Sequence, residues 1–290
     1  MVKKTALTIG LSLFLFTSFA GGTETQPTQG YSQALKTTVD QLKHLELSKI
    51  IKEASIAVWE TKRVVDLLQK GDRDEALTAL RRVYSLLEKL EREYGAKRFP
   101  VDMEFVEFSA KLDLEQAQSY NHRVKKLTEE NDFVSARFLL NLLRDEIDII
   151  TTYLPLDVYK YAINLAIKLV ENGKIKSAIM ALESALSTLE VETAVVPKPP
   201  LKAQVLVNLA QKLYKIDPNS ALKFVEKAQE EVKMAVALGY ARSEKDLEPI
   251  IKTLTELRKA IKERLANVGE KFDETKQKLQ ELRKNLTVSY

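Results

Sequence analysis

Two histidines and a few closely spaced carboxylates are the residues of this chain that could carry catalysis or bind a metal ion. His44 and His122 are the only histidines, and neither has a partner at the spacing that zinc sites use. Asp102 and Glu104 are two residues apart, which puts both on one side of a strand, where two acids can act as general acid and base or bind Ca²⁺. The simpler interpretation, which we favour, is that they hydrate the outer face of that strand.

Other motifs of enzyme chemistry are absent from the sequence. It contains no Gly-x-Ser-x-Gly elbow, no glycine-rich phosphate loop or dinucleotide fingerprint, and no cysteine. We therefore expect a protein that is not an enzyme and that needs no cofactor and no metal. An enzyme with an unrecognised carboxylate site, for which Asp145 and Asp148 are further candidates, is the alternative.

A cluster of aromatic side chains beside a helix break predicts the ligand-binding residues. Tyr153, Tyr159 and Tyr161 surround Pro155, which fits the first turn of a helix. Tyr159 and Tyr161 are two residues apart, so they cannot share one face of that helix, and we expect one to pack inward while the other lines a groove. Such a groove suits apolar or planar ligands, although aromatic residues here are also ordinary core and boundary residues.

The first twenty residues have the pattern of a secretory signal peptide. A short basic start is followed by an apolar run and by small residues before an expected cut after Ala20. The apolar run is shorter than the about 20 residues of a membrane-spanning helix. We expect residues 1–20 to be removed, residues 21–30 to form a disordered tether, and the mature protein to work in the periplasm without a membrane span.

The composition limits the partners of the mature chain. Without residues 1–20 the count of Lys and Arg falls from 45 to 43 against 41 acids, and a net charge of about +2 argues against binding to nucleic acid. With no cysteine, the fold must be held by packing alone. Charged residues make up 30% of the chain, which fits long exposed helical faces and is also typical of proteins from a thermophile.

Helical periodicity runs through most of the chain. Apolar residues recur every three or four positions. Capping residues such as Gly71, Asp72 with Glu75, and Asp132 mark the ends of the helical segments. The sequence predicts an all-α fold, in which eight or nine helices form antiparallel hairpins in a bundle. The expected helices lie at about 50–70, 72–94, 110–130, 132–152, 155–172, 174–189, 200–215 and 217–238.

Two short segments break the helical pattern. Residues 100–107 and 190–196 alternate apolar and polar side chains with a period of two, and a proline-rich exit closes the second segment. Because a lone strand cannot satisfy its backbone hydrogen bonds, we expect these segments to pair with each other as one small two-stranded β element.

Residues 246–290 are expected to form one long helix with an apolar seam. The apolar residues step mostly by alternating threes and fours, close to a heptad repeat, and about 40 helical residues would span about 60 Å. Part of the seam therefore needs a partner, which is either a second copy of the chain or its own N-terminal helix, and Gly269 could split the helix. The residues predicted to form an interface in a homo-oligomer are Leu254, Leu257, Ile261, Leu265, Val268, Phe272, Leu279 and Leu282.

Over about residues 48–255, the chain contains in this order the segments Val101 to Glu104, Ala136 to Ile147, Thr151 to Leu156, Ala185 to Thr193, and Ala237 to Tyr240. The order and spacing of these segments are similar to those of the YfdX family. Ala241 stands where the family pattern suggests glycine, and the seam beyond about residue 255 looks like an extension. We therefore expect a YfdX-like helical domain at residues 31–245, followed by the long helix at residues 246–290.

The resemblance implies an exported bacterial helical protein that tends to oligomerise, that is linked to envelope stress such as acid or drug exposure, and that has no accepted enzymatic activity. Our leading hypothesis is a non-catalytic periplasmic binding or chaperone-like protein, with unfolded client proteins or small apolar ligands as partners. The alternative is an oligomeric scaffold that organises other envelope proteins through helical hairpins. Three of its hairpins resemble tetratricopeptide hairpins without their regular period.

Overall fold

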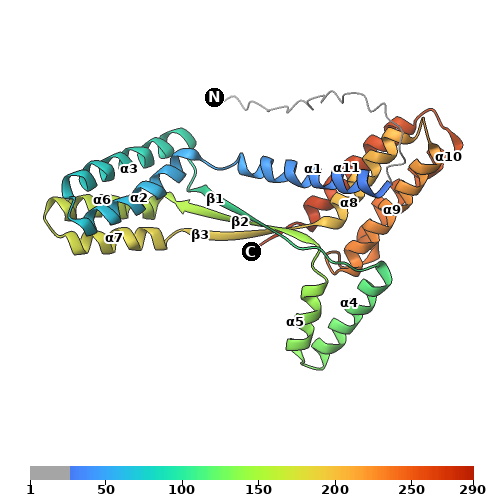
Figure 1. The fold of residues 1–290 in the computed structure, drawn as a ribbon, viewed down its shortest axis with the longest axis horizontal. Helices are drawn as coiled ribbons and strands as arrows, with labels where there is room; N and C mark the ends of the chain where they lie inside the picture. The colour runs from blue at the N-terminus through green and yellow to red at the C-terminus, as the bar shows by residue number, and fades with distance from the viewer. Residues whose placement is uncertain (1–26) are drawn as a thin grey trace.

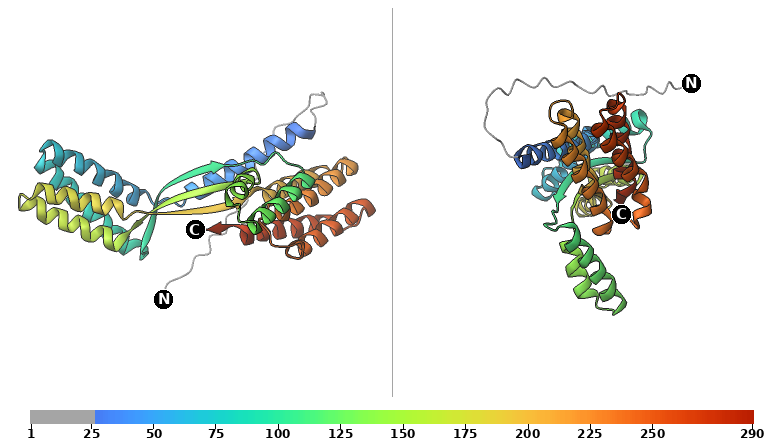
Figure 2. Two further views of the ribbon diagram at one scale, coloured as in Figure 1. Left: turned by 90° about the horizontal axis from the view of Figure 1, so that it is seen from below. Right: turned by 90° about the vertical axis from the view of Figure 1, so that its right-hand side faces the viewer.

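The computed structural model describes residues 27–290, so the predicted signal peptide at residues 1–20 lies outside the described part of the chain. The first described helix, α1 (Pro27–Leu47), begins inside the stretch that was predicted to be a disordered tether. Pro27 suits the first turn of a helix because its missing N–H needs no partner there. Beyond α1, two helical bundles stand at opposite ends of a small sheet, and a helical hairpin projects from the side (Figure 1, Figure 2).

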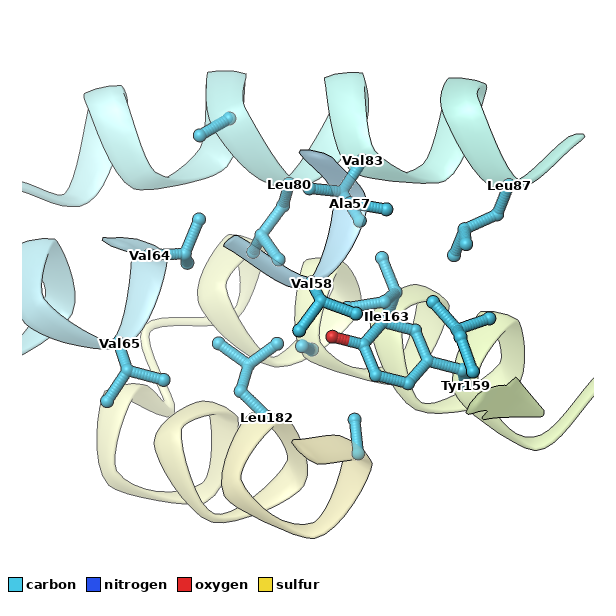
Figure 3. Packing of buried hydrophobic residues seen from close by; sticks show 14 of the residues in the cluster. Ala57, Val58, Val64, Val65, Leu80, Val83, Leu87, Tyr159, Ile163 and Leu182 are labelled. Atoms are coloured by element: carbon cyan, nitrogen blue, oxygen red, sulfur yellow. The ribbon is translucent and has the colours of Figure 1, made fainter. Parts of the chain in front are cut away.

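The first bundle consists of four helices, α2 (Lys52–Lys70), α3 (Arg73–Tyr94), α6 (Leu156–Glu171) and α7 (Ile175–Ser187). The periodicity predicted each of them to within a few residues. They form a ring in which α2 packs on α3, α3 on α6, α6 on α7 and α7 on α2. Their apolar stripes meet in one core, where Leu80, Ile163 and Leu182 are completely buried (Figure 3).

The second bundle contains α8 (Lys198–Leu213), α9 (Pro218–Ala237), the short 3₁₀ helix η1 (Glu244–Leu247), α10 (Glu248–Glu263) and α11 (Val268–Leu286). The predicted single helix at residues 246–290 is wrong. The chain reverses after α10 at Arg264, which has a positive φ of 53°, and α11 packs back on α10 and α8. Gly269 lies inside α11 and is not the break. The reversal buries an apolar stripe that one helix of this length would leave in water.

The apolar seam is therefore used inside the chain. Seven of the eight residues that were predicted at an interface between copies are buried in the core of the second bundle, and Leu254, Phe272 and Leu279 are completely inaccessible. Leu265 lies in the turn and stays 42% exposed. Because the fold-back supplies the partner that the seam needs, a second copy of the chain is not required to cover it.

The sheet contains four antiparallel strands in the order β1 (Arg98–Glu107), β2 (Glu146–Pro155), β3 (Glu190–Pro197) and β4 (Val288–Ser289). The two predicted strands correspond to β1 and β3, but their predicted pairing with each other is wrong because β2 lies between them. β2 occupies the last part of the helix that was predicted at residues 132–152. Its residues are mostly apolar or β-branched on both faces, which is typical of a central strand but has no period that separates a strand from a helix.

A helical hairpin formed by α4 (Leu114–Glu129) and α5 (Phe133–Leu142) projects from the junction of the sheet and the second bundle (Figure 1, Figure 2). Its inner side packs on the end of α9. Its outer side is uncovered by the described chain, since Phe133, Val134 and Phe138 of α5 are 61%, 83% and 66% exposed. The hairpin therefore presents a row of large apolar side chains to solvent.

The helix ends confirm some of the predicted caps and correct one. Gly71 ends α2 in the left-handed conformation, with φ at 89°, where a residue with a Cβ would be strained. The side chain of Asp132 accepts a hydrogen bond from the N–H of Ser135 at the start of α5. Asp72 stands at the start of α3 but makes no side-chain capping hydrogen bond. None of the helices in residues 27–290 is both long and apolar enough to cross a membrane.

Candidate functional site

One face of the sheet is only partly covered by helices. α1 packs on this face through Val39, which belongs to a small core with Ile147, Ile149 and Val196 of the sheet (Figure 1). Between α1, the sheet and the C-terminal end of α11, a cleft of about 540 Å³ remains. Sites for small molecules have volumes of about 300–1,000 Å³. The cleft is therefore the candidate functional site.

The pleat of the strands determines the floor of the cleft. Alternate residues of a strand point to the same face, and the register places Met103 of β1 opposite Thr151 of β2, and Ile149 of β2 opposite Ala194 of β3. All four line the cleft, so its floor is mostly apolar. Leu45 of α1 lines the helical side and remains 51% exposed. An apolar group placed in the cleft would therefore contact both the sheet and α1.

Arg283, close to the end of α11, is the main polar feature of the cleft. Its side chain is half-buried and lines the cleft, but it forms no hydrogen bond or salt bridge with any described residue. The carboxylate of Glu46 on α1 interacts electrostatically with Arg283. Glu46 forms a salt bridge with Lys49 and none with Arg283. Burial lowers the pKa of the Arg283 guanidinium from its ordinary value, because the nearby charge of Glu46 does not fully compensate for lost hydration.

The second carboxylate of the cleft is already paired. Glu192 of β3 accepts a hydrogen bond from Arg98 of β1 at 2.8 Å. The guanidinium carbon of Arg98 also lies 4.4 Å from the centre of the Tyr153 ring, in a cation–π contact. Arg98 is therefore held in place by protein groups, whereas Arg283 is not.

The structure separates the residues that were predicted to form one groove. Tyr153 lines the cleft, but Tyr159 is completely buried in the core of the first bundle, and Tyr161 is 71% exposed on the other side of α6. Pro155 precedes α6 in an extended conformation and does not line the cleft. Only Tyr153 of the four predicted residues therefore belongs to the candidate site.

The predicted carboxylate pair and the histidines lie on the surface. Asp102 and Glu104 are exposed on the face of β1 opposite to Met103, which confirms that they hydrate the outer face of the strand. His44 and His122 are both exposed. Within residues 27–290, no three His, Asp or Glu side chains are grouped so that they could hold a metal ion.

A buried polar cluster at the junction of the sheet with the second bundle was not predicted. Asp145 is 1% exposed, and one of its carboxylate oxygens lies 2.6 Å from the Nζ of Lys202 on α8. The same Nζ lies 4.0 Å from a carboxylate oxygen of Glu231 on α9. The hydroxyl of Tyr240 accepts a hydrogen bond from the N–H of Asp145 and donates one to Glu146 at 2.7 Å.

Burial has a strong effect on one acid of this cluster. It raises the pKa of Glu231 to about 6, and the negative charges of Asp145 and Glu230 add to the increase, while the positive charge of Lys202 opposes it. Arg144 completes the neighbouring network, since it donates a hydrogen bond to Asp148 at 2.6 Å and another to Glu146. The carboxylates are mostly paired with cations, so the cluster joins the sheet to α8 and α9.

The sequence contained only a weak signal for the buried polar cluster and for the position of Arg283 in the cleft. The spacing of Asp145 and Asp148 marked a carboxylate pair, but their partners Lys202 and Glu231 are distant in sequence and indistinguishable from surface charges. Arg283 has no motif around it, and its place in the cleft depends on the reversal of the chain before α11.

Comparison with known proteins gives one family match. Residues 57–195 match the model of the YfdX family, described as "YfdX protein". A solved structure of Salmonella Typhi YfdX is similar with 16% sequence identity over 50% of this chain and 90% of that one, at a TM-score of 0.37. No curated protein matches the chain. The family match includes β1, β2 and most of β3, which form the floor of the cleft, but neither α1 nor α11.

Proposed function

We propose that this chain, with its YfdX region at residues 57–195, is a non-catalytic binding protein that holds a small apolar or amphipathic ligand in the cleft between α1, the sheet and α11. The observation that carries the proposal is the cleft itself, which has a volume of about 540 Å³ and a mostly apolar floor. Its floor is already formed by the paired strands β1, β2 and β3, with one register shift between Pro100 and Asp102 of β1.

The energetics favour modest affinity. Burial of apolar surface contributes about 25 cal/mol per Å², so a ligand tail that loses about 200 Å² of exposed surface gains about 5 kcal/mol before the cost of association. Exposed Leu45 and half-buried Met103 would also lose contact with water when a ligand covers them. A protein of this kind would collect abundant small molecules and release them readily.

We further propose that this binding takes place in the periplasm and contributes to tolerance of envelope stress such as acid or drug exposure. The support for export is the signal-peptide pattern of residues 1–20, and the support for the stress link is the family resemblance. Export is tested by isolating the protein from the periplasm of an expressing cell and measuring the mass of its N-terminal peptide. We expect that peptide to begin at Gly21.

The binding proposal is tested with the neutral apolar dye 1-anilinonaphthalene, whose fluorescence rises when it leaves water. An Ala194→Phe substitution fills the floor of the cleft and is expected to remove most of the fluorescence gain. Val191 lies on the same strand but on the opposite, exposed face, so Val191→Phe is the matched control and is expected to bind like the unchanged protein. Equal binding by all three proteins would contradict the proposal.

The uncovered face of α5 favours a second function. Phe133, Val134 and Phe138 are all more than half exposed, and rows of large apolar side chains mark surfaces that bind proteins. This face supports a chaperone-like protein that holds unfolded clients, or a scaffold that assembles with other envelope proteins through its hairpins.

Two measurements on one variant separate these roles from ligand binding. The double substitution Val134→Ser with Phe138→Ser removes apolar surface without touching a buried residue. If α5 binds clients, the variant loses the ability to suppress aggregation of an acid-unfolded protein. If α5 joins copies of the chain, the variant has a lower mass by light scattering. Dye binding in the cleft is expected to stay unchanged in both cases, and no change in any assay would contradict a role for α5.

A further inference from the structure

We propose that the cleft selects ligands with an anionic head group, which Arg283 binds, and an apolar tail, which lies on the sheet between Met103 and Ala194. This inference rests on the proposed function and names the chemical class of its ligand. The class is a small amphipathic anion whose head is a carboxylate, a sulfonate or a phosphate.

The side chain of Arg283 has unused hydrogen-bonding capacity. A guanidinium has five N–H donors in a planar fork that fits the oxygens of carboxylates and phosphates. Such a group is seldom placed in a partly buried site without a partner, because lost hydration is costly when no hydrogen bond replaces it. Arg283 is half-buried and lines the cleft, and its side chain has no hydrogen bond or salt bridge within the described chain. An anionic ligand would supply the missing partner.

The charges around the cleft leave Arg283 without a neutralising carboxylate. The carboxylates that line it are Glu46 and Glu192, and each already has a cation of its own, Lys49 and Arg98 respectively. Arg283 therefore remains as a positive charge that no lining carboxylate neutralises by contact. Exposed Lys284, the next residue along α11, adds to the same sign. The local field attracts an anion and repels a cation.

The polar and apolar parts of the cleft lining come from different elements. Arg283 comes from α11, while the apolar floor comes from β1, β2 and β3 through Met103, Ile149 and Ala194. A ligand with a charged end and an apolar body can satisfy both surfaces at once. A small polar anion would leave the floor uncovered, and a purely apolar ligand would cover Arg283 without giving it a partner, which costs free energy.

The test compares two dyes that share one ring system, the neutral 1-anilinonaphthalene and its 8-sulfonate. The unchanged protein is expected to bind the sulfonate more tightly. Arg283→Gln is expected to lower the affinity for the sulfonate about tenfold or more, as expected for loss of a hydrogen bond between charged groups, and to leave the neutral dye within about twofold. Arg283→Lys keeps the charge without the planar fork, so it is expected to lose less than Arg283→Gln.

The controls separate failure of this inference from failure of the proposed function. Arg137→Gln removes the same charge from the exposed surface of α5 and is expected to leave both dyes unaffected. Circular dichroism of each variant checks that it is folded. If the neutral dye binds in the cleft but Arg283→Gln leaves the sulfonate unaffected, or weakens both dyes equally, the inference is wrong while the proposed function stands. If neither dye responds to Ala194→Phe, the proposed function itself is wrong.

Discussion

The core of the first bundle and the cleft beside α1 differ in how completely their apolar side chains are covered. In the bundle, four helices bring Leu80, Tyr159 and Ile163 together and bury each of them completely (Figure 3). On the sheet, a single helix and the end of another cover only part of an apolar face and leave about 540 Å³ open. The bundle buries its apolar surface in one core, whereas the cleft leaves some apolar surface of the sheet and of α1 uncovered.

The two regions also differ in how they relate to the family match. All four helices of the bundle lie within or largely within residues 57–195, while α1 and α11, the helical walls of the cleft, lie outside that match. The floor of the cleft belongs to the matched region.

The largest expected change in the free energy of unfolding comes from a substitution in the core of the first bundle. Leu80→Ala removes a completely buried side chain and leaves a cavity, so we expect the free energy of unfolding to fall by about 3 kcal/mol, within the range of about 2–5 kcal/mol for such changes. The loss is measured by urea denaturation followed by circular dichroism. A loss below about 1 kcal/mol would contradict the tight packing of this core.

The second effect depends on pH and concerns the junction between the sheet and α9. Burial raises the pKa of Glu231 from 4.5 to about 6, so the folded state binds its proton more tightly than the unfolded state. The contribution of protonated Glu231 to the free energy of unfolding is full below about pH 4.5 and is lost as the pH rises through about 6. For a pKa shift of this size, the free energy of unfolding decreases by about 2 kcal/mol.

Glu231→Gln isolates this contribution. Its side chain cannot ionise, so the difference in unfolding free energy between the two proteins should change by about 2 kcal/mol between pH 4 and pH 7. The groups that face Glu231, namely Lys202, Asp145, Glu230 and Tyr31, are present in both proteins. A constant difference over this range would show that Glu231 titrates as an exposed acid.

A smaller change in stability is expected at Tyr159 in the core of the first bundle. Its buried hydroxyl forms no hydrogen bond by distance and angle with a described residue, and the hydroxyl of Thr61 donates to the carbonyl oxygen of Ala57 at 2.7 Å. Tyr159→Phe removes an unsatisfied group, so we expect the free energy of unfolding to rise by about 1 kcal/mol. Thermal unfolding measures it, and a clear loss of stability would reveal a hydrogen bond.

The smallest effect on stability is expected in the cleft. Met103 lines the cleft and is half-buried, so Met103→Ala removes few packing contacts and should cost less than about 1 kcal/mol. The same urea experiment as for Leu80→Ala measures it. A loss as large as that of Leu80→Ala would mean that the cleft region is packed like the bundle and has no space for a ligand.

Much of the helical framework could be predicted because it depends on local signals. The spacing of apolar residues and caps such as Gly71 and Asp132 gave the bounds of most helices to within a few residues. β2 was missed because a strand with apolar residues on both faces has no period of two, and an apolar run next to a helix resembles its continuation. The reversal at Arg264 was missed because a positive φ at arginine has no signal in the sequence.

The candidate site could be predicted only in part because it depends on distant contacts. Tyr153 was predicted from its position beside a helix break, and it does line the cleft. The role of α1 was not predicted, because an N-terminal helix was considered only as one of two partners for the C-terminal seam and was not expected to pack on a sheet. Arg283 could not be identified, because only the fold-back of α11 brings it to the sheet.

The most direct test of the account uses the methionines as reporters. Apart from Met1, the chain has Met103 in the cleft, Met180 exposed on α7, and Met234 packed near the α4–α5 hairpin. With ¹³C-labelled methionine methyl groups, titration with 1-anilinonaphthalene-8-sulfonate should shift the Met103 signal in a saturable way and leave Met180 and Met234 in place. A shift of Met180 or Met234 without a shift of Met103 would contradict a ligand site in the cleft.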